Sequence, residues 1–181
     1  MTRLQAVDPA TATGKTKELF NAVEKKLGTV PNMMRTMGNS VAVLNGYLAF
    51  SSALNESKIG ARVGEQIAMA VAEEDQCEYC LSAHSYIGEK LLGMDAAILS
   101  SSREAGTGNT KVDAALVFAQ TLVRKKGLVD DEDVNKVRAA GYGDAEIAEI
   151  VAHTALNIFT NYINNTAKTV VDFPKVELAA V

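Results

Sequence analysis

Cys77, Cys80 and His84 follow one another at steps of three and four residues. At about 100° per residue, these side chains fall within roughly 60° of one another on a helix. One helical stripe would therefore carry two thiols and an imidazole. Cys77 would lie in the first turn, where the helix dipole favours the nucleophilic thiolate, whereas nearby carboxylates raise the pKa of a thiol. The carboxylates around that turn are Glu73, Glu74, Asp75 and Glu78.

Glu65 is predicted to face this stripe from a neighbouring helix. If the polar stretch Glu73–Gln76 is the turn of a helical hairpin, Glu65 and His84 are equally far from its centre on antiparallel helices. A carboxylate opposite an imidazole, itself one turn from a thiol, is a proton-relay arrangement. The candidate catalytic residues are therefore Cys80, Cys77, His84 and Glu65.

Two readings without redox catalysis stay open for the cysteine pair. The thiols could be small buried residues of a helix, or half of a metal site. In the second case Cys77, Cys80 and His84 would bind the ion together with Glu65, or with His153 from the last helix.

A polar stripe on the last predicted helix, with a group of methionines, suggests a third alternative. The stripe could line the active site, form a subunit contact or simply be exposed. A non-enzymatic helical oligomer, acting as a redox sensor or a scaffold, would use such surfaces. The stripe consists of His153, Asn157, Asn161 and Asn164 or Asn165, and the methionines are Met33, Met34 and Met37.

The hydrophobic pattern predicts an all-α fold and a single domain over residues 1–181, because no segment shows sustained period-two alternation. The stretch Ser100–Gly108 is expected to be a loop, and Asp144 is expected to cap the last helix. The expected helices cover Thr13–Leu27, a short segment from Val30, Val41–Leu54, Gly60 to the polar end at Glu73, Cys77–Leu92, a short segment after Asp95, Thr110–Lys126, Asp131–Ala140 and Ala145–Lys168.

Composition narrows the function classes. Hydrophobic residues make up 48% and charged residues 22% of 181 residues, with a net charge of −4. That charge, without a basic face, argues against nucleic acid as a partner, and no apolar run approaches the ~20 residues of a membrane helix. The start of the chain has no long apolar stretch, so we expect no signal peptide and a cytoplasmic location. In such a chain, two cysteines this close favour catalysis or metal binding over a structural disulfide.

These residues resemble the signature of the alkyl hydroperoxidase D-like proteins, within the carboxymuconolactone decarboxylase superfamily. In that signature a Glu precedes a Cys-x-x-Cys pair by twelve residues, as Glu65 precedes Cys77, and a His follows the second Cys by four, as His84 follows Cys80. The likeness is specific for about residues 62–97. The Asn-rich last helix and the closing Val-Asp-Phe-Pro at 171–174 resemble the subgroup of peroxidase-related proteins.

The resemblance implies an all-helical fold, a homo-oligomer (dimer, trimer or hexamer) and a cofactor-free peroxidase cycle. A hydroperoxide would be the substrate, and a dithiol or a protein would be the reductant. Cys80 would be the peroxidatic thiol, Cys77 its disulfide partner, and Glu65 and His84 the relay. Well-known peroxidase members carry a second His between the two Cys, where this chain has Tyr79, so the proton route is expected to differ. Members without the Cys pair do decarboxylation chemistry, which the two thiols here argue against.

Overall fold

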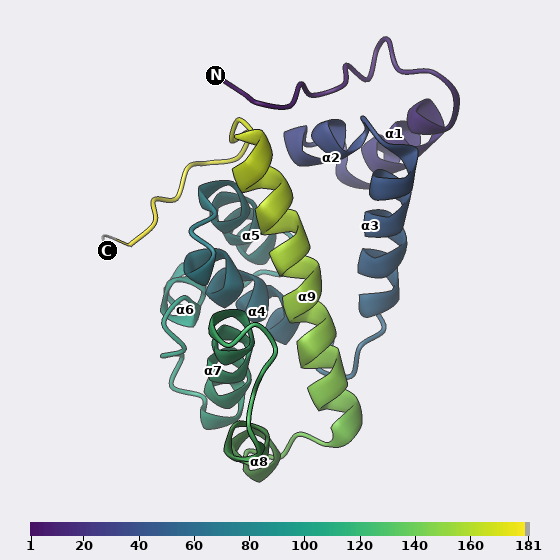
Figure 1. Cartoon of the computed structure of the whole chain (residues 1–181). Helices are drawn as coiled ribbons and strands as arrows, with labels where there is room; N and C mark the ends of the chain where they lie inside the picture. Colours follow the sequence, from purple (N-terminus) through teal and green to yellow (C-terminus); the bar gives the residue numbers. More distant parts are fainter. Residues whose placement is uncertain (180–181) are drawn as a thin grey trace.

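The computed structural model describes residues 1–179, which form α-helices and connecting segments without a β-strand in that range. The all-α prediction is confirmed. Figure 1 shows the long last helix, α9, with α3 on one side and α4, α5 and α7 on the other. None of the helices within residues 1–179 combines the length and apolar character needed to cross a membrane. The helices are α1 (Gly14–Leu27), α2 (Asn32–Met37), α3 (Val41–Leu54), α4 (Gly60–Glu74), α5 (Glu78–Lys90), α6 (Ala96–Ser102), α7 (Thr110–Arg124), α8 (Asp131–Ala139) and α9 (Asp144–Ala167).

Most helices begin and end close to the residues predicted from the sequence. Gly28 ends α1 in the left-handed region, with φ of 78°. The Ser40 side chain accepts a hydrogen bond from the Val43 N–H and caps α3. The predicted loop from Ser100 is wrong at its start, because α6 continues to Ser102. The Ser102 hydroxyl donates to the Ile98 carbonyl one turn back, which satisfies it within the helix.

The expected cap at Asp144 is also wrong, since Asp144 is the first residue inside α9 and Gly143 takes the N-cap position. The Glu146 carboxylate accepts a hydrogen bond from the Gly143 N–H at 2.8 Å. Asp144 instead pairs with Arg138 at 2.7 Å. An acidic residue in the first turn still interacts favourably with the helix dipole, so the charge of Asp144 stabilises the start of α9 without capping it.

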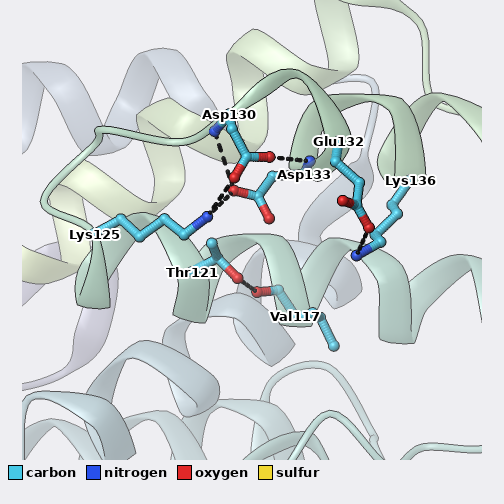
Figure 2. A network of polar contacts seen from close by, with 7 residues as sticks. All are labelled: Val117, Thr121, Lys125, Asp130, Glu132, Asp133 and Lys136. Atoms are coloured by element: carbon cyan, nitrogen blue, oxygen red, sulfur yellow. Dashed lines mark hydrogen bonds and ion pairs between the residues drawn. The ribbon is translucent and has the colours of Figure 1, made fainter.

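The connection from α7 to α8 is fixed by a polar network, shown in Figure 2. Asp130 and Asp133 form a capping box, in which each carboxylate accepts the backbone N–H of the other residue. Lys125, just past the end of α7, binds both carboxylates, at 2.9 and 2.5 Å. Lys125 thereby ties the end of α7 to the start of α8.

Helix α4 belongs to both hydrophobic cores of the molecule. Met69 and Ala72 pack into the core shared with α1, α2, α3 and α5, whereas Ile67, Ala70 and Val71 pack into the core shared with α7 to α9. Every residue from 66 to 72 is buried. Such a helix has little freedom to shift, so it is a rigid support for Glu65 at its border.

The segment after α9, residues 168–179, runs from the end of α9 past α5 (Figure 1), and its hydrogen bonds reach the starts of α2 and α5. The Asp172 carboxylate accepts a hydrogen bond from the Asn32 N–H at 2.8 Å and so caps α2. The Val176 N–H donates to the Ser82 hydroxyl of α5 at 3.0 Å. This C-terminal segment therefore joins α2 to α5, the helix whose start carries the cysteine pair.

The contact between α1 and the end of α2 leads to a stability prediction. Gly38 has a right-handed backbone, but a Cβ there would overlap with the buried ring of Phe20, with Cε1 at 2.9 Å. We expect Gly38→Ala to lower the free energy of unfolding by roughly 1–3 kcal/mol, because a rigid ring must move in a packed core.

Gly46→Ala is the matched control. Gly46 is exposed within α3 and has no neighbour within 4 Å of an added Cβ. That change should stabilise the protein by about 0.5–1 kcal/mol through helix propensity. Urea unfolding measures both, and an equal effect of the two substitutions would contradict the packing argument.

Candidate active site

Glu65 of α4 and His84 of α5 are in direct contact. Glu65 Oε1 lies 2.7 Å from His84 Nδ1, and the two side chains are 12% and 21% exposed. The chain reverses between the helices through Asp75, Gln76 and Cys77, and Gln76 adopts a left-handed φ of 52°. The structure thus brings together the carboxylate and the imidazole that the sequence paired.

Cys77 and Cys80 are free, buried thiols at the start of α5. Cys77 is the N-cap residue, and its Sγ accepts a hydrogen bond from the Cys80 N–H at 3.4 Å. Helix α9 reaches the second sulfur, since Asn164 Nδ2 donates to Cys80 Sγ at 3.2 Å. Each sulfur therefore accepts one N–H hydrogen bond, which favours the charged thiolate.

The surroundings shift the pKa values of the two thiols in opposite directions. Hydrogen bonding from Cys80 outweighs burial and lowers the pKa of the Cys77 thiol, and the charge of His84 adds to this effect. Burial raises the pKa of the Cys80 thiol well above its usual range, and the neighbouring Cys77 raises it further. Cys77 is therefore the more acidic of the two thiols, and because the sulfurs interact, the pair titrates as one system.

The carboxylates expected to oppose the Cys77 thiolate are mostly neutralised. Of the four, only Asp75 is among the groups that raise the pKa of Cys77. The other three form ion pairs with basic side chains, and an exposed or paired carboxylate exerts little field at a distance. These pairs are Arg103 with Glu73, Arg124 with Glu74, and Lys175 with Glu78.

The carboxylate of Glu65 shifts the pKa of His84. Burial alone would lower the pKa of the imidazole, but the charge and hydrogen bond of Glu65 outweigh it, with help from Cys77 and Asn157, so the net pKa is raised. Glu65 thus favours the protonated imidazolium over the neutral ring. No hydrogen bond joins His84 to either sulfur among the described residues, so its effect on Cys77 is exerted through charge.

A cavity of about 540 Å³ opens onto this group. Cys80, His84 and Glu65 line it, whereas Cys77 is not among its described lining residues. A ligand in the cavity would therefore contact Cys80 and not Cys77. The apolar wall includes Met33, Met34, Tyr47, Tyr79, Ile87 and Phe173.

The polar stripe of α9 lies against the site along its length. His153 and Asn157 line the cavity. His153 Nε2 lies 3.1 Å from the Ser57 hydroxyl, and its ring packs on Gly64, where an added Cβ would be 2.8 Å from Cε1. Burial lowers the pKa of His153, so this second imidazole stays neutral at pH 7. Farther along, Asn161 donates to the Asp75 carboxylate at 3.0 Å.

Tyr79, which lies between the two cysteines, is held by packing and by hydrogen bonds. Its hydroxyl accepts the Met33 N–H at 3.0 Å, and its ring meets Phe173 edge-on at a centroid distance of 5.8 Å. Burial raises the pKa of the phenol far above its usual range. Tyr79 therefore anchors α2 and the C-terminal segment, and it cannot exchange protons as a histidine at this position would.

Tyr47 of α3 was not among the residues singled out from the sequence. It lines the cavity, and burial raises the pKa of its phenol to about 12, with contributions from Cys80 and Glu65. It stays a neutral O–H donor beside the site. Its place thirty residues before the cysteine pair gives no local spacing signal, so only the packing of α3 reveals it.

The described residues offer no set of ligands for the metal ion of the metal-binding alternative. Within residues 1–179, no group of three or more His, Cys, Asp or Glu side chains is arranged to hold a metal ion. His153 faces Ser57 and Gly64 instead of joining the two thiols.

The chain matches solved structures more clearly than it matches sequences. No protein-family model matches it, and no curated protein matches its sequence. An uncharacterized peroxidase-related protein from Silicibacter sp. TM1040 superposes with a TM-score of 0.79 and 25% identity, over 94% of each chain. An alkylhydroperoxidase AhpD core protein from Ralstonia eutropha JMP134, also described as peroxidase-related, gives a TM-score of 0.81 and 23% identity, over 94% of this chain and 92% of that one. The debrominase Bmp8, as a cysteine-to-alanine variant with 2,3,4-tribromopyrrole, gives 0.79 and 21%, over 95% and 92%.

Proposed function

From its alkyl hydroperoxidase D-like fold and the thiol pair beside its cavity, we propose that this protein is a thiol-dependent peroxidase. It reduces hydroperoxides through a dithiol–disulfide cycle of Cys77 and Cys80. The observation that carries the proposal is the arrangement at the cavity. Cys80 faces it beside the His84–Glu65 pair, and Cys77 lies behind with the lower pKa.

In the first step the Cys80 sulfur attacks the terminal oxygen of the hydroperoxide. The O–O bond breaks, an S–O bond forms, and Cys80 becomes a sulfenic acid while the peroxide is reduced to an alcohol. The Cys80 proton passes to the Cys77 thiolate, and the departing alkoxide takes a proton from the His84 imidazolium. The raised pKa of Cys80 is compatible with this role, because Cys77 accepts the proton as attack begins.

In the second step Cys77 releases the proton that it received from Cys80, and a water relays this proton to neutral His84. The Cys77 thiolate then attacks the Cys80 sulfenic acid. The S–S bond forms, and the hydroxyl group leaves as water after protonation by His84. The net change is one hydroperoxide and two thiols converted into one alcohol, one water and one disulfide. An external dithiol or protein dithiol reduces the disulfide and closes the cycle.

The cavity supports an organic hydroperoxide as substrate. Its volume of about 540 Å³ and its wall of methionine, aromatic and aliphatic side chains suit an apolar group better than hydrogen peroxide. Burying such a group excludes water from the reacting sulfur. We therefore expect a higher kcat/KM for cumene hydroperoxide than for hydrogen peroxide.

The proposal is tested by two measurements on the purified protein. With dithiothreitol as reductant, cumene hydroperoxide should be consumed catalytically. After one equivalent of peroxide without reductant, mass spectrometry should find Cys77 and Cys80 joined as a disulfide. Two free thiols remaining after peroxide has been added would contradict the cycle.

The debrominase among the structural neighbours suggests a second candidate activity for the same thiols. Two thiols can reduce a carbon–bromine bond, giving a carbon–hydrogen bond, bromide, a proton and one disulfide. The apolar cavity would accept a small brominated ring as well as an organic hydroperoxide. Bromide release from 2,3,4-tribromopyrrole, compared with peroxide consumption under the same conditions, distinguishes the two substrates.

We also propose that the protein forms a homo-oligomer. Exposed apolar side chains gather on the outer surface of α9, where Val151, Phe159 and Tyr162 are 42%, 37% and 60% exposed. Exposed apolar surface of this kind is typical of a subunit contact. Sedimentation in reduced and oxidised conditions measures the assembly. A change of size with redox state, without any turnover, would favour the non-enzymatic sensor over the peroxidase.

A further inference from the structure

We propose that Asn164 is a further catalytic residue, whose side-chain amide stabilises negative charge on the Cys80 sulfur. The inference rests on the proposed thiol chemistry and adds a third structural element to it. Helix α9 would then supply a donor to the reacting atom, in addition to lining the cavity.

The geometry places the amide directly on the sulfur. Asn164 Nδ2 lies 3.2 Å from Cys80 Sγ, and both residues are buried, at 3% and 2% exposure. Away from water, a donor aimed at a developing charge is worth more than at the surface, and it needs no reorganisation when the charge forms. From outside the cysteine pair, Asn164 supplies such a donor to Cys80 with the larger effect, and Thr160, one turn earlier on α9, acts in the same direction.

The neighbouring asparagines hold this amide in place. Asn161 and Asn165 both bond to the turn between α4 and α5, Asn161 to the Asp75 carboxylate at 3.0 Å and Asn165 to the Asp75 carbonyl at 2.8 Å. Helix α9 is thus fastened to the turn on either side of Asn164. The donor is held ready before any substrate arrives.

The other end of the Asn164 side chain has no competing role. Its Oδ1 atom is buried and has no hydrogen-bond partner among the described residues. The contact with Cys80 is therefore the polar interaction that orients the amide. A buried polar group with this single partner is a poor choice for stability alone, since a half-satisfied amide is costly to bury.

The test measures the ionisation of Cys80 directly, without peroxide. In a Cys77→Ser background, where serine still caps α5, isotopically labelled cysteine gives one NMR signal whose titration reports Cys80. We expect Asn164→Leu, which keeps a similar volume and removes the donor, to raise the pKa of Cys80 by about one unit. That shift is a tenfold smaller thiolate fraction.

Asn165→Ala is the matched control, because it removes an asparagine bond from the same helix to the same turn but leaves the sulfur untouched. It should not shift the titration, because the bond from Asn161 to Asp75 still fastens α9 to the turn and keeps the Asn164 amide on the sulfur. Asn164→Ala, checked for folding by circular dichroism, provides a second variant should leucine not be accommodated. An unchanged pKa of Cys80 in a folded Asn164 variant, or an equal shift in Asn165→Ala, overturns the proposal. Because the titration uses no peroxide, its outcome is independent of whether the protein is a peroxidase.

Discussion

Cys80→Ser should abolish peroxide turnover, lowering kcat/KM by at least about 10³-fold, because a serine hydroxyl cannot replace the attacking sulfur. Cys80 is the thiol that lines the cavity. Cys77→Ser should behave differently. It keeps the attacking sulfur and retains a good N-cap for α5, but it cannot close the disulfide.

The two variants are separated by single-turnover experiments with a sulfenic-acid trap such as dimedone. In Cys77→Ser, one equivalent of cumene hydroperoxide should be consumed and the trap should attach to Cys80. In Cys80→Ser, neither event should occur at a comparable rate. If dimedone attached to Cys77 in Cys80→Ser as fast as it attaches to Cys80 in Cys77→Ser, Cys77 would be the attacking thiol and Cys80 its disulfide partner. Equal turnover of Cys80→Ser and the wild type would end the peroxidase proposal.

The second large effect is expected for Glu65→Gln. The substitution keeps the shape of the side chain but removes the charge that lies 2.7 Å from His84. The pKa of His84 should fall, because burial then acts without its main opposing influence. Loss of a positioned acid–base group typically costs about 10²–10⁴-fold in rate. We therefore expect a loss of this order near pH 7.

NMR titration checks the cause, since the chain contains only two histidines and His84 gives one of two resolved signals. Glu149→Gln is the matched control. Glu149 acts on His153, so that change should leave the titration of His84 in place. If Glu65→Gln lost activity with an unchanged pKa of His84, the carboxylate would act by some means other than tuning the imidazole.

The same pair gives a pH dependence of stability with a definite sign. The folded pKa of His84 is raised above its ordinary value. The Glu65–His84 pair therefore contributes its full stability below the unfolded pKa of histidine, and this contribution is lost as pH rises through the folded pKa. Glu65→Gln should abolish this dependence. Urea unfolding of both proteins across the range from mildly acidic to mildly alkaline pH measures the difference.

The local features of this protein were open to prediction because they depend on short spacings. The phase of Cys77, Cys80 and His84 follows from the geometry of one helix, and their shared stripe needed no knowledge of the rest of the chain. The caps at Gly28 and Ser40 follow from backbone and side-chain chemistry at single positions. Two helix ends were predicted wrongly. Near Ser100 the helix continues because a serine hydroxyl can bond within a helix, and near Asp144 the glycine before it takes the cap position equally well.

The resemblance to the alkyl hydroperoxidase D-like proteins is supported by the fold, although no family model matches the sequence. At about a quarter identity, a few residues around the thiol pair carried the likeness. The surrounding helices keep their arrangement because packing depends on apolar pattern and volume more than on residue identity.

The sequence by itself therefore determined the helical class and the residues available for thiol chemistry, since both are written in spacings of a few residues. Only the tertiary structure decided which thiol faces the cavity, which carboxylates are neutralised by ion pairs, and which groups from α3 and α9 reach the site. Tyr47 and Asn164 lie thirty-three and eighty-four residues from Cys80, their partner in the cysteine pair. Such contacts arise from how helices pack around a shared core, and burial, which tunes Cys80 and His84 in opposite directions, exists only once that core has formed.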